Sequence, residues 1–238
     1  MAEYAKANNI DHYVQREAQL KIQPDIFITN RSKESYSKHG GFLPIFEKEN
    51  AFWHLDDYDQ IAIIDADIYI RPNSPNIFED FGVDHAWGGV SEREMPITDA
   101  YKDKITNYSM MQYHQLHLKN VDFKPNKFGY EFFNMGMILL NTNLFKPHLK
   151  NQNPNQFLRR VEFMDFINGT GNWKWSTDQT LLNYFLKKYD VSVKSMSHVW
   201  NGLFTVNTQI DECHFIHFFL KDKLPDRGEN VEQLMEQI

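Results

Sequence analysis

The sequence predicts an α/β fold, in which short buried strands alternate with helices that cover the sheet. Residues 61–64 are apolar and mostly β-branched, and the run is too short for a typical helix, so it is predicted as a buried strand. The apolar stretch 132–141 is predicted as a second strand. Apolar residues recur at helical spacing through 157–167 and 181–186. Strand patterns that alternate with helix patterns are typical of α/β domains.

The composition limits the class of protein to which the chain belongs. With 238 residues, 19 Phe, 11 Tyr and 5 Trp, the chain can build a sizeable core. The net charge of -7 and the lack of a dense basic cluster predict that nucleic acid is not a partner. The single cysteine, Cys213, excludes an intrachain disulfide.

No apolar run approaches the roughly 20 residues that a membrane span requires, so no transmembrane segment is predicted. Met1 is followed at once by a polar stretch rather than by a signal peptide, and a cytoplasmic location is predicted. No internal repeat divides the chain, so residues 1–238 are predicted as a single domain.

The sequence is predicted to begin inside the fold, at a helix rather than at the first strand. Residues 2–9 have a helix pattern, although in an α/β fold a helix normally follows a strand. Segments 10–14 and 24–28 are strand candidates, and the polar residues 29–41 are predicted as a loop. In 42–55, apolar residues recur at helical spacing and predict a core-facing helix: Phe42, Ile45, Phe46, Phe52 and Trp53.

A short helix at 77–81 and a strand at 86–90 are predicted after the central strand. The irregular stretch 91–130, with weak helical signal in 108–118, is predicted as a long loop over the active face. Aromatic residues of this region are interpreted either as a surface for a sugar acceptor or as packing residues: Trp87, Tyr101, Tyr108 and Tyr113.

The C-terminal half is predicted to be richer in helix. Asn153 and Pro154 have the pattern of an N-cap and a first helical residue, and Gly169 is predicted to end that helix. The remaining predictions are a helix from Asp178, strands at 191–193 and within 213–220, and a terminal helix after residue 225.

Two carboxylates, Asp65 and Asp67, follow the central strand one residue apart. Side chains alternate along a strand, so both are predicted to face one side while Ala66 faces the other. Two adjacent carboxylates repel each other, and a hard cation such as Mg²⁺ or Mn²⁺ removes that repulsion. The pair therefore predicts a metal-assisted site for a substrate that carries a diphosphate. Capping of a turn is the alternative interpretation of the same two residues.

Five short motifs, in order along residues 38–223, resemble those of one enzyme family. Asp65-Ala66-Asp67 resembles an Asp-x-Asp metal motif, and Phe133-Asn134-Met135-Gly136 resembles a Phe-Asn-x-Gly segment. The other three are Asp178-Gln179 with Leu182-Asn183, the pair Trp200-Asn201, and His217 with Lys223. On these motifs the chain resembles the GT-A glycosyltransferases, particularly the glycogenin-like and lipopolysaccharide galactosyltransferase family. Leu220 departs from the family, which has glycine there.

The resemblance implies a GT-A fold with a central, mostly parallel sheet flanked by helices. The family's first strand, which helps to hold the nucleotide base, has no counterpart before Ala2 and is expected to be missing.

The resemblance also assigns roles to individual residues. The implied metal ligands are Asp65, Asp67 and His217. The implied contacts to the sugar donor are Lys38, Asp65, Ala66, Asn134, Gly136 and Lys223, and the implied catalytic residues are Asp178 and Gln179. Each residue has a structural alternative: a core histidine for His217, a helix N-terminus for Asp178, a strand entry for Asn134 and Gly136, and solvated lysines.

The implied function is transfer of a hexose from a nucleotide-diphosphate sugar, with UDP-glucose or UDP-galactose favoured, to a glycan, lipid-glycan or protein-glycan hydroxyl. Mn²⁺ or Mg²⁺ is the implied cofactor, with retention of the anomeric configuration. No second carboxylate is clearly a nucleophile, so the leaving diphosphate is expected to help deprotonate the acceptor. Two alternatives stay open: a sugar-binding or inactive GT-A scaffold, and a metal-dependent sugar nucleotidyltransferase, which would normally have a Gly-rich phosphate loop.

Overall fold

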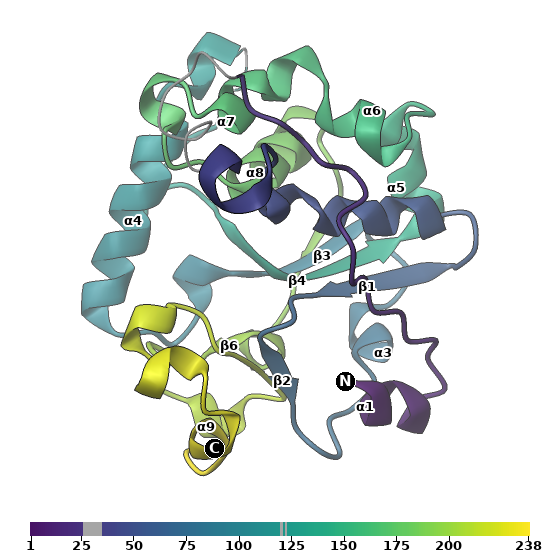
Figure 1. The fold of residues 1–238 in the computed structure, drawn as a ribbon, viewed down its shortest axis with the longest axis vertical. Coiled ribbons are helices and arrows are strands. Elements are labelled where there is room, and N and C mark those ends of the chain that lie inside the picture. The colour runs from purple at the N-terminus through teal and green to yellow at the C-terminus, as the bar shows by residue number, and fades with distance from the viewer. Residues whose placement is uncertain (26–34, 120, 122) are drawn as a thin grey trace.

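The computed structural model describes residues 1–25, 35–119, 121 and 123–238 of the chain. Its main sheet has four strands in the order β1-β4-β3-β5. Their bounds are β1 (Gln60–Ile64), β3 (Trp87–Ser91), β4 (Phe133–Asn141) and β5 (Val193–Ser195). Helices lie on both sides of this sheet (Figure 1), so the predicted α/β class is confirmed.

Strand direction in the main sheet is mixed. β4 pairs antiparallel with both β1 and β3, while β5 pairs parallel with β3. β1, β3 and β5 therefore run in one direction, as expected for a mostly parallel sheet. Two of the three strand pairs are nevertheless antiparallel, because the reversed β4 lies between β1 and β3 and hydrogen-bonds to both.

A smaller sheet begins where β1 ends. β2 (Ile68–Ile70) pairs antiparallel with β7 (Phe215–His217), and β7 pairs parallel with β6 (Gly202–Leu203). Residues 65–67 join β1 to β2, so the chain passes from one sheet to the other within a single turn. The register pairs Ile68 with His217, and this brings the C-terminal part of the chain to the end of β1.

Two hydrophobic cores lie on the two sides of the main sheet. Ile138 and Leu140 of β4 belong to one core, and Met137 and Leu139 belong to the other. This alternation follows from the two-residue period of a strand. Because both faces are covered, all nine residues of β4 are buried, and the run 137–140 within it is apolar on both faces.

Four of the helices that contribute to the first core lie above the sheet in Figure 1. They are α5 (Thr142–Leu149), α6 (Pro154–Leu158), α7 (Met164–Asn168) and α8 (Asp178–Lys188). α5 was not predicted, because Pro147 lies inside it and proline normally argues against a helix interior.

The helix predicted to run to Gly169 is divided. Asn153 caps α6 in a capping box, as its side chain accepts from Gln156 N–H. A 3₁₀ turn, Val161–Phe163, separates α6 from α7. Gly169 ends α7 with a φ of 66°, the left-handed conformation that glycine adopts without strain.

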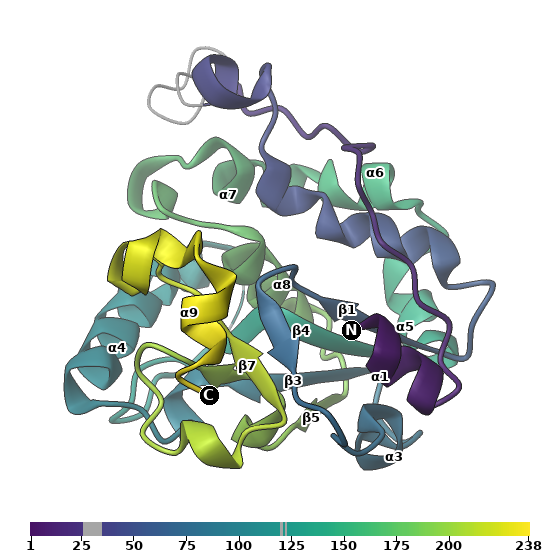
Figure 2. The same ribbon diagram turned by 60° about the horizontal axis from the view of Figure 1, so that its bottom comes forward.

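The other helices are α1 (Ala2–Ala7), α3 (Ile77–Phe81), α4 (Asp99–Tyr113) and α9 (Val231–Met235). α1 lies against the start of α3, where Ile77 N–H donates to the Tyr4 hydroxyl (Figure 2). Residues 35–39 are also helical. None of the helices in the described ranges is long and apolar enough to cross a membrane. Further 3₁₀ turns are Glu92–Glu94, Leu116–Lys119, Gly171–Trp173, His198–Trp200, Ile210–Glu212, Lys221–Lys223 and Pro225–Gly228.

Three predictions need correction. Segment 10–14 is not a strand, since no described strand pairs with it. Segment 42–55 forms two 3₁₀ helices, Pro44–Phe46 and Lys48–His54, and the predicted core residues Ile45 and Trp53 are exposed. The predicted loop 91–130 contains the 15-residue helix α4. The strand candidate 24–28 lies largely outside the described residues.

Candidate active site

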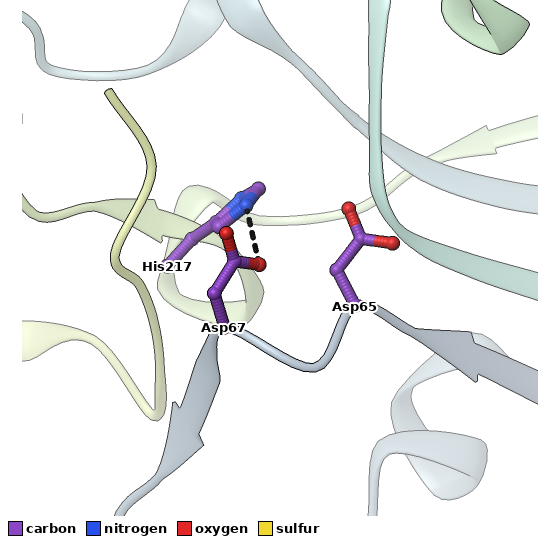
Figure 3. A group of neighbouring side chains, drawn as sticks. All are labelled: Asp65, Asp67 and His217. Atoms are coloured by element: carbon purple, nitrogen blue, oxygen red, sulfur yellow. Dashed lines mark ion pairs between the residues drawn. The ribbon is translucent and has the colours of Figure 1, made fainter. Parts of the chain in front are cut away.

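The two carboxylates lie in the turn between the two sheets rather than in a strand. Asp65 N–H donates to Gly136 O over 2.8 Å, and Ile68 N–H donates to Asp65 O over 3.1 Å, which closes the turn. Ala66 is exposed. The carboxylates of Asp65 and Asp67 nevertheless point to the same side (Figure 3). The turn therefore produces the arrangement that the sequence attributed to strand alternation.

His217 of β7 lies beside this pair. One ligand atom from each of Asp65, Asp67 and His217 lies within 4.8 Å of the others. His217 Nε2 is 3.3 Å from Asp67 Oδ1, the ion pair drawn in Figure 3. Partial burial works to raise the pKa of Asp67, but the hydrogen bond and charge of His217 outweigh it and hold that pKa below its usual value. Two carboxylates and an imidazole form a donor set that fits Mn²⁺.

Gly136 leaves the space that the His217 ring fills. A Cβ at residue 136 would stand 2.4 Å from His217 Cε1 and 2.6 Å from its Nδ1. Gly136 therefore leaves room for the imidazole, and its implied contact with a sugar donor stays a prediction.

Gly136→Ala is expected to displace His217, weaken Mn²⁺ binding and lower stability by about 1–3 kcal/mol. Isothermal titration with Mn²⁺ and thermal melts measure the two effects. Gly89→Ala on β3 is the control, because a Cβ there meets nothing closer than 3.3 Å. Normal Mn²⁺ affinity in Gly136→Ala would contradict the packing argument.

Lys48 joins the carboxylate pair to helix α8. Its Nζ lies 2.9 Å from both Asp65 Oδ1 and Asp178 Oδ2, and it donates to Met135 O over 2.8 Å. Burial alone would lower the pKa of Lys48, but the charges of Asp178 and Asp65 outweigh it and raise that pKa. Asp178 is buried at the N-terminus of α8, and burial raises its pKa even though Lys48 opposes this. One ammonium group thus holds two carboxylates from distant segments.

Glu49, next to Lys48, is fully buried, and neither of its carboxyl oxygens has a hydrogen-bond partner in the described part of the chain. Burial raises the pKa of Glu49 well above its usual value, and the negative charge of Asp178 adds to this. Glu49 therefore holds its proton at a pH at which the unfolded chain has lost it.

The buried Glu49 makes stability fall as pH rises. Above a pH of about 4.5, the unfolded chain ionises this group while the folded chain keeps it protonated, so the free energy of unfolding decreases by up to about 1.4 kcal/mol per pH unit. Glu49→Gln is expected to remove this slope, as measured by urea unfolding between pH 5 and 8. If the free energy of unfolding depended on pH to the same extent in the wild type and in Glu49→Gln, the raised pKa of Glu49 would be wrong.

Two predicted site residues, the donor contact Asn134 and the catalytic candidate Gln179, both bond a carboxylate that lies outside the sequence motifs. Glu92 Oε1 accepts from Asn134 Nδ2 over 2.6 Å and from Gln179 Nε2 over 3.0 Å. Burial raises the pKa of Glu92, and the two amide groups oppose the rise. Asn183, from the same motif as Gln179, instead bonds the backbone N–H and C=O of Phe133.

The remaining site residues are more peripheral. Lys223 and Lys38 are exposed, and their contact with a sugar donor stays a prediction. Lys221 is close enough to help lower the pKa of Asp67. Leu220, which stands where the family has glycine, adopts the left-handed conformation with a φ of 58°.

Four aromatic residues had two interpretations, as a surface for a sugar acceptor or as packing residues. Three of them are packing residues. Trp87, Tyr101 and Tyr113 are buried in the cores, and Tyr108 is partly buried. The acceptor role is therefore wrong for the three buried residues.

Lys48, Glu49, Glu92 and the unassigned Asn201 are the site residues that sequence reasoning missed. The sequence did carry one indication of the charged three: they lie within or beside apolar patterns typical of the core, at 48–49 and directly after β3.

No protein-family model matches the chain, and no curated protein matches it significantly. Among solved structures, the WbbM bifunctional glycosyltransferase in its apo form aligns at 15% identity with a TM-score of 0.43, over 73% of this chain and 31% of that one. The apo form of mouse xyloside xylosyltransferase 1 aligns at 17% identity with a TM-score of 0.44, over 87% of this chain and 71% of that one. The chain thus spans under a third of the WbbM chain.

Proposed function

We propose that this chain is a metal-dependent glycosyltransferase of the GT-A type, and that residues 1–238 form its catalytic domain. The observation that carries the proposal is the cluster of Asp65, Asp67 and His217, whose ligand atoms lie within 4.8 Å, beside the buried Lys48–Asp178 pair. Two carboxylates and an imidazole in this proximity suit a divalent cation, and the neighbouring polar side chains suit sugar hydroxyls.

Each group has a role in this proposal. Asp65, Asp67 and His217 would hold Mn²⁺ or Mg²⁺, which would neutralise charge on the leaving nucleoside diphosphate. Lys48 pairs with both Asp65 and Asp178 and fixes the orientation of their carboxylates. Gln179 donates its amide N–H to Glu92, so its carbonyl oxygen is available to a sugar hydroxyl or to positive charge at the anomeric carbon.

The finer assignments are also part of the proposal. We favour UDP-glucose or UDP-galactose as sugar donor, a glycan-type acceptor, retention of configuration and a cytoplasmic location. Retention is proposed from the motif resemblance, and Asp178, whose carboxylate is paired with Lys48, is assigned no base role in it.

The test is release of nucleoside diphosphate from UDP-, GDP- and TDP-sugars with Mn²⁺, Mg²⁺ or EDTA. Slow hydrolysis of one sugar donor that EDTA abolishes is the expected result. Release of pyrophosphate would indicate a nucleotidyltransferase instead. Binding of a sugar donor without turnover would indicate a binding domain and overturn the catalytic proposal.

A further inference from the structure

A line of buried polar side chains connects His217 to Glu92. His217 Nδ1 lies 3.1 Å from Asn201 Oδ1, and Asn201 Nδ2 donates to Asn134 Oδ1 over 2.8 Å. Asn134 Nδ2 in turn donates to Glu92 Oε1 over 2.6 Å. All four side chains are at most 5% exposed, so water does not compete for these hydrogen bonds.

The direction of every hydrogen bond in this line follows from one backbone group. Gly136 N–H donates to Asn134 Oδ1 over 2.9 Å, and a backbone N–H cannot accept. The oxygen of Asn134 must therefore face Gly136 and Asn201, and its NH₂ group must face Glu92. Asn201 then has to present NH₂ to Asn134 and its oxygen to His217.

The last hydrogen bond determines the state of the imidazole. Asn201 Oδ1 can only accept, so Nδ1 of His217 carries a proton. The other nitrogen, Nε2, is the one that faces Asp67 at 3.3 Å. A metal-ligating histidine commonly donates its second ring N–H to a neighbouring group in this way, which orients the ring and raises its basicity.

We propose that Glu92, Asn134 and Asn201 are positioning residues that orient His217 so that Nε2 is presented to a divalent cation held with Asp65 and Asp67. This inference rests on the proposed metal site. Glu92 also accepts from Gln179, so the same carboxylate positions a candidate ligand of the sugar donor. A single buried carboxylate therefore couples the orientation of the metal site to that of the sugar site.

Asn201→Leu tests the orientation of His217, because leucine has a similar shape and cannot accept from Nδ1. The affinity for Mn²⁺, followed by the electron paramagnetic resonance of free Mn²⁺ in the absence of substrate, is expected to fall about 10–100-fold. Asn141→Leu is the matched control. It is also a buried asparagine, but it lies at the far end of β4 and donates to Val83 O. Its Mn²⁺ affinity is expected to equal that of the wild type.

A second test reverses the direction of the hydrogen bond between Asn134 and Glu92, and it compares a single with a double variant. Asn134→Asp places a second acceptor against Glu92 and is expected to weaken Mn²⁺ binding. The double variant Asn134→Asp/Glu92→Gln restores a donor–acceptor pair at this position, because the new amide can donate where the carboxylate accepted, and it is expected to recover the affinity. A melting temperature measured without metal reports the structural cost of each variant separately.

The outcomes separate the two proposals. If the wild-type chain does not bind Mn²⁺, the metal site itself is wrong. If the wild type binds Mn²⁺ and Asn201→Leu binds it equally well, the metal site stands and the positioning role is overturned. Equal losses in Asn201→Leu and Asn141→Leu would also overturn it, because the effect would then follow from general destabilisation.

Discussion

Asp67→Asn is expected to reduce the affinity for Mn²⁺, and with it the metal-dependent hydrolysis of a sugar donor, by at least about 100-fold. Asp67 contacts His217 and no other described charged side chain within ion-pair distance, so its substitution removes a ligand without breaking the Lys48 bridge. Asp65→Asn would remove a proposed metal ligand and would also break the ion pair with Lys48. Asp67 is therefore the cleaner test of the metal site.

The measurement is nucleoside-diphosphate release at saturating Mn²⁺ together with a direct Mn²⁺ titration. Asp99→Asn is the control, since the carboxylate of Asp99 is 98% exposed and its ion pair within the described ranges is a surface contact with Lys102. The metal-free melting temperature of Asp67→Asn should stay close to that of the wild type. Turnover that is unchanged and still sensitive to EDTA would show that the metal binds elsewhere.

Lys48→Met is expected to give the largest loss of stability. The substitution leaves the carboxylates of Asp65 and Asp178 without their shared cation and Met135 O without its donor. Removal of one partner from a buried ion pair costs about 3–5 kcal/mol, because the remaining charge is left desolvated. The partial exposure of Asp65 puts the expected loss near the lower end of this range.

Urea unfolding at pH 7 measures this loss. Lys48→Met/Asp178→Asn is expected to recover part of it, because the deeper of the two uncompensated charges is then removed. Lys102→Met is the matched control: it breaks an exposed pair with Asp99 at 3.5 Å and should change stability little. Equal effects of Lys48→Met and Lys102→Met would contradict a structural role for the bridge.

Several elements were predictable because their signal is local. β1 and β4 each contain a run of four apolar residues, 61–64 and 137–140, and α8 has apolar residues at helical spacing after an N-terminal Asp. α4 was missed for an equally local reason. Its buried positions include Ser109 and Gln112, so its buried stripe is not an apolar stripe in the sequence.

The sequence by itself determined the α/β class, the carboxylate pair after β1 and its partner histidine, the last through family motifs. Tertiary structure alone decided how these groups are supported. Asn201 and Asn134 are 67 residues apart, and Lys48 and Met135 are 87 apart. Periodicity reports contacts within one helix face or strand, whereas a buried polar group finds its partner wherever the folded chain brings one. For this reason the roles of Lys48, Glu92 and Asn201 could be found only once the two sheets were placed side by side.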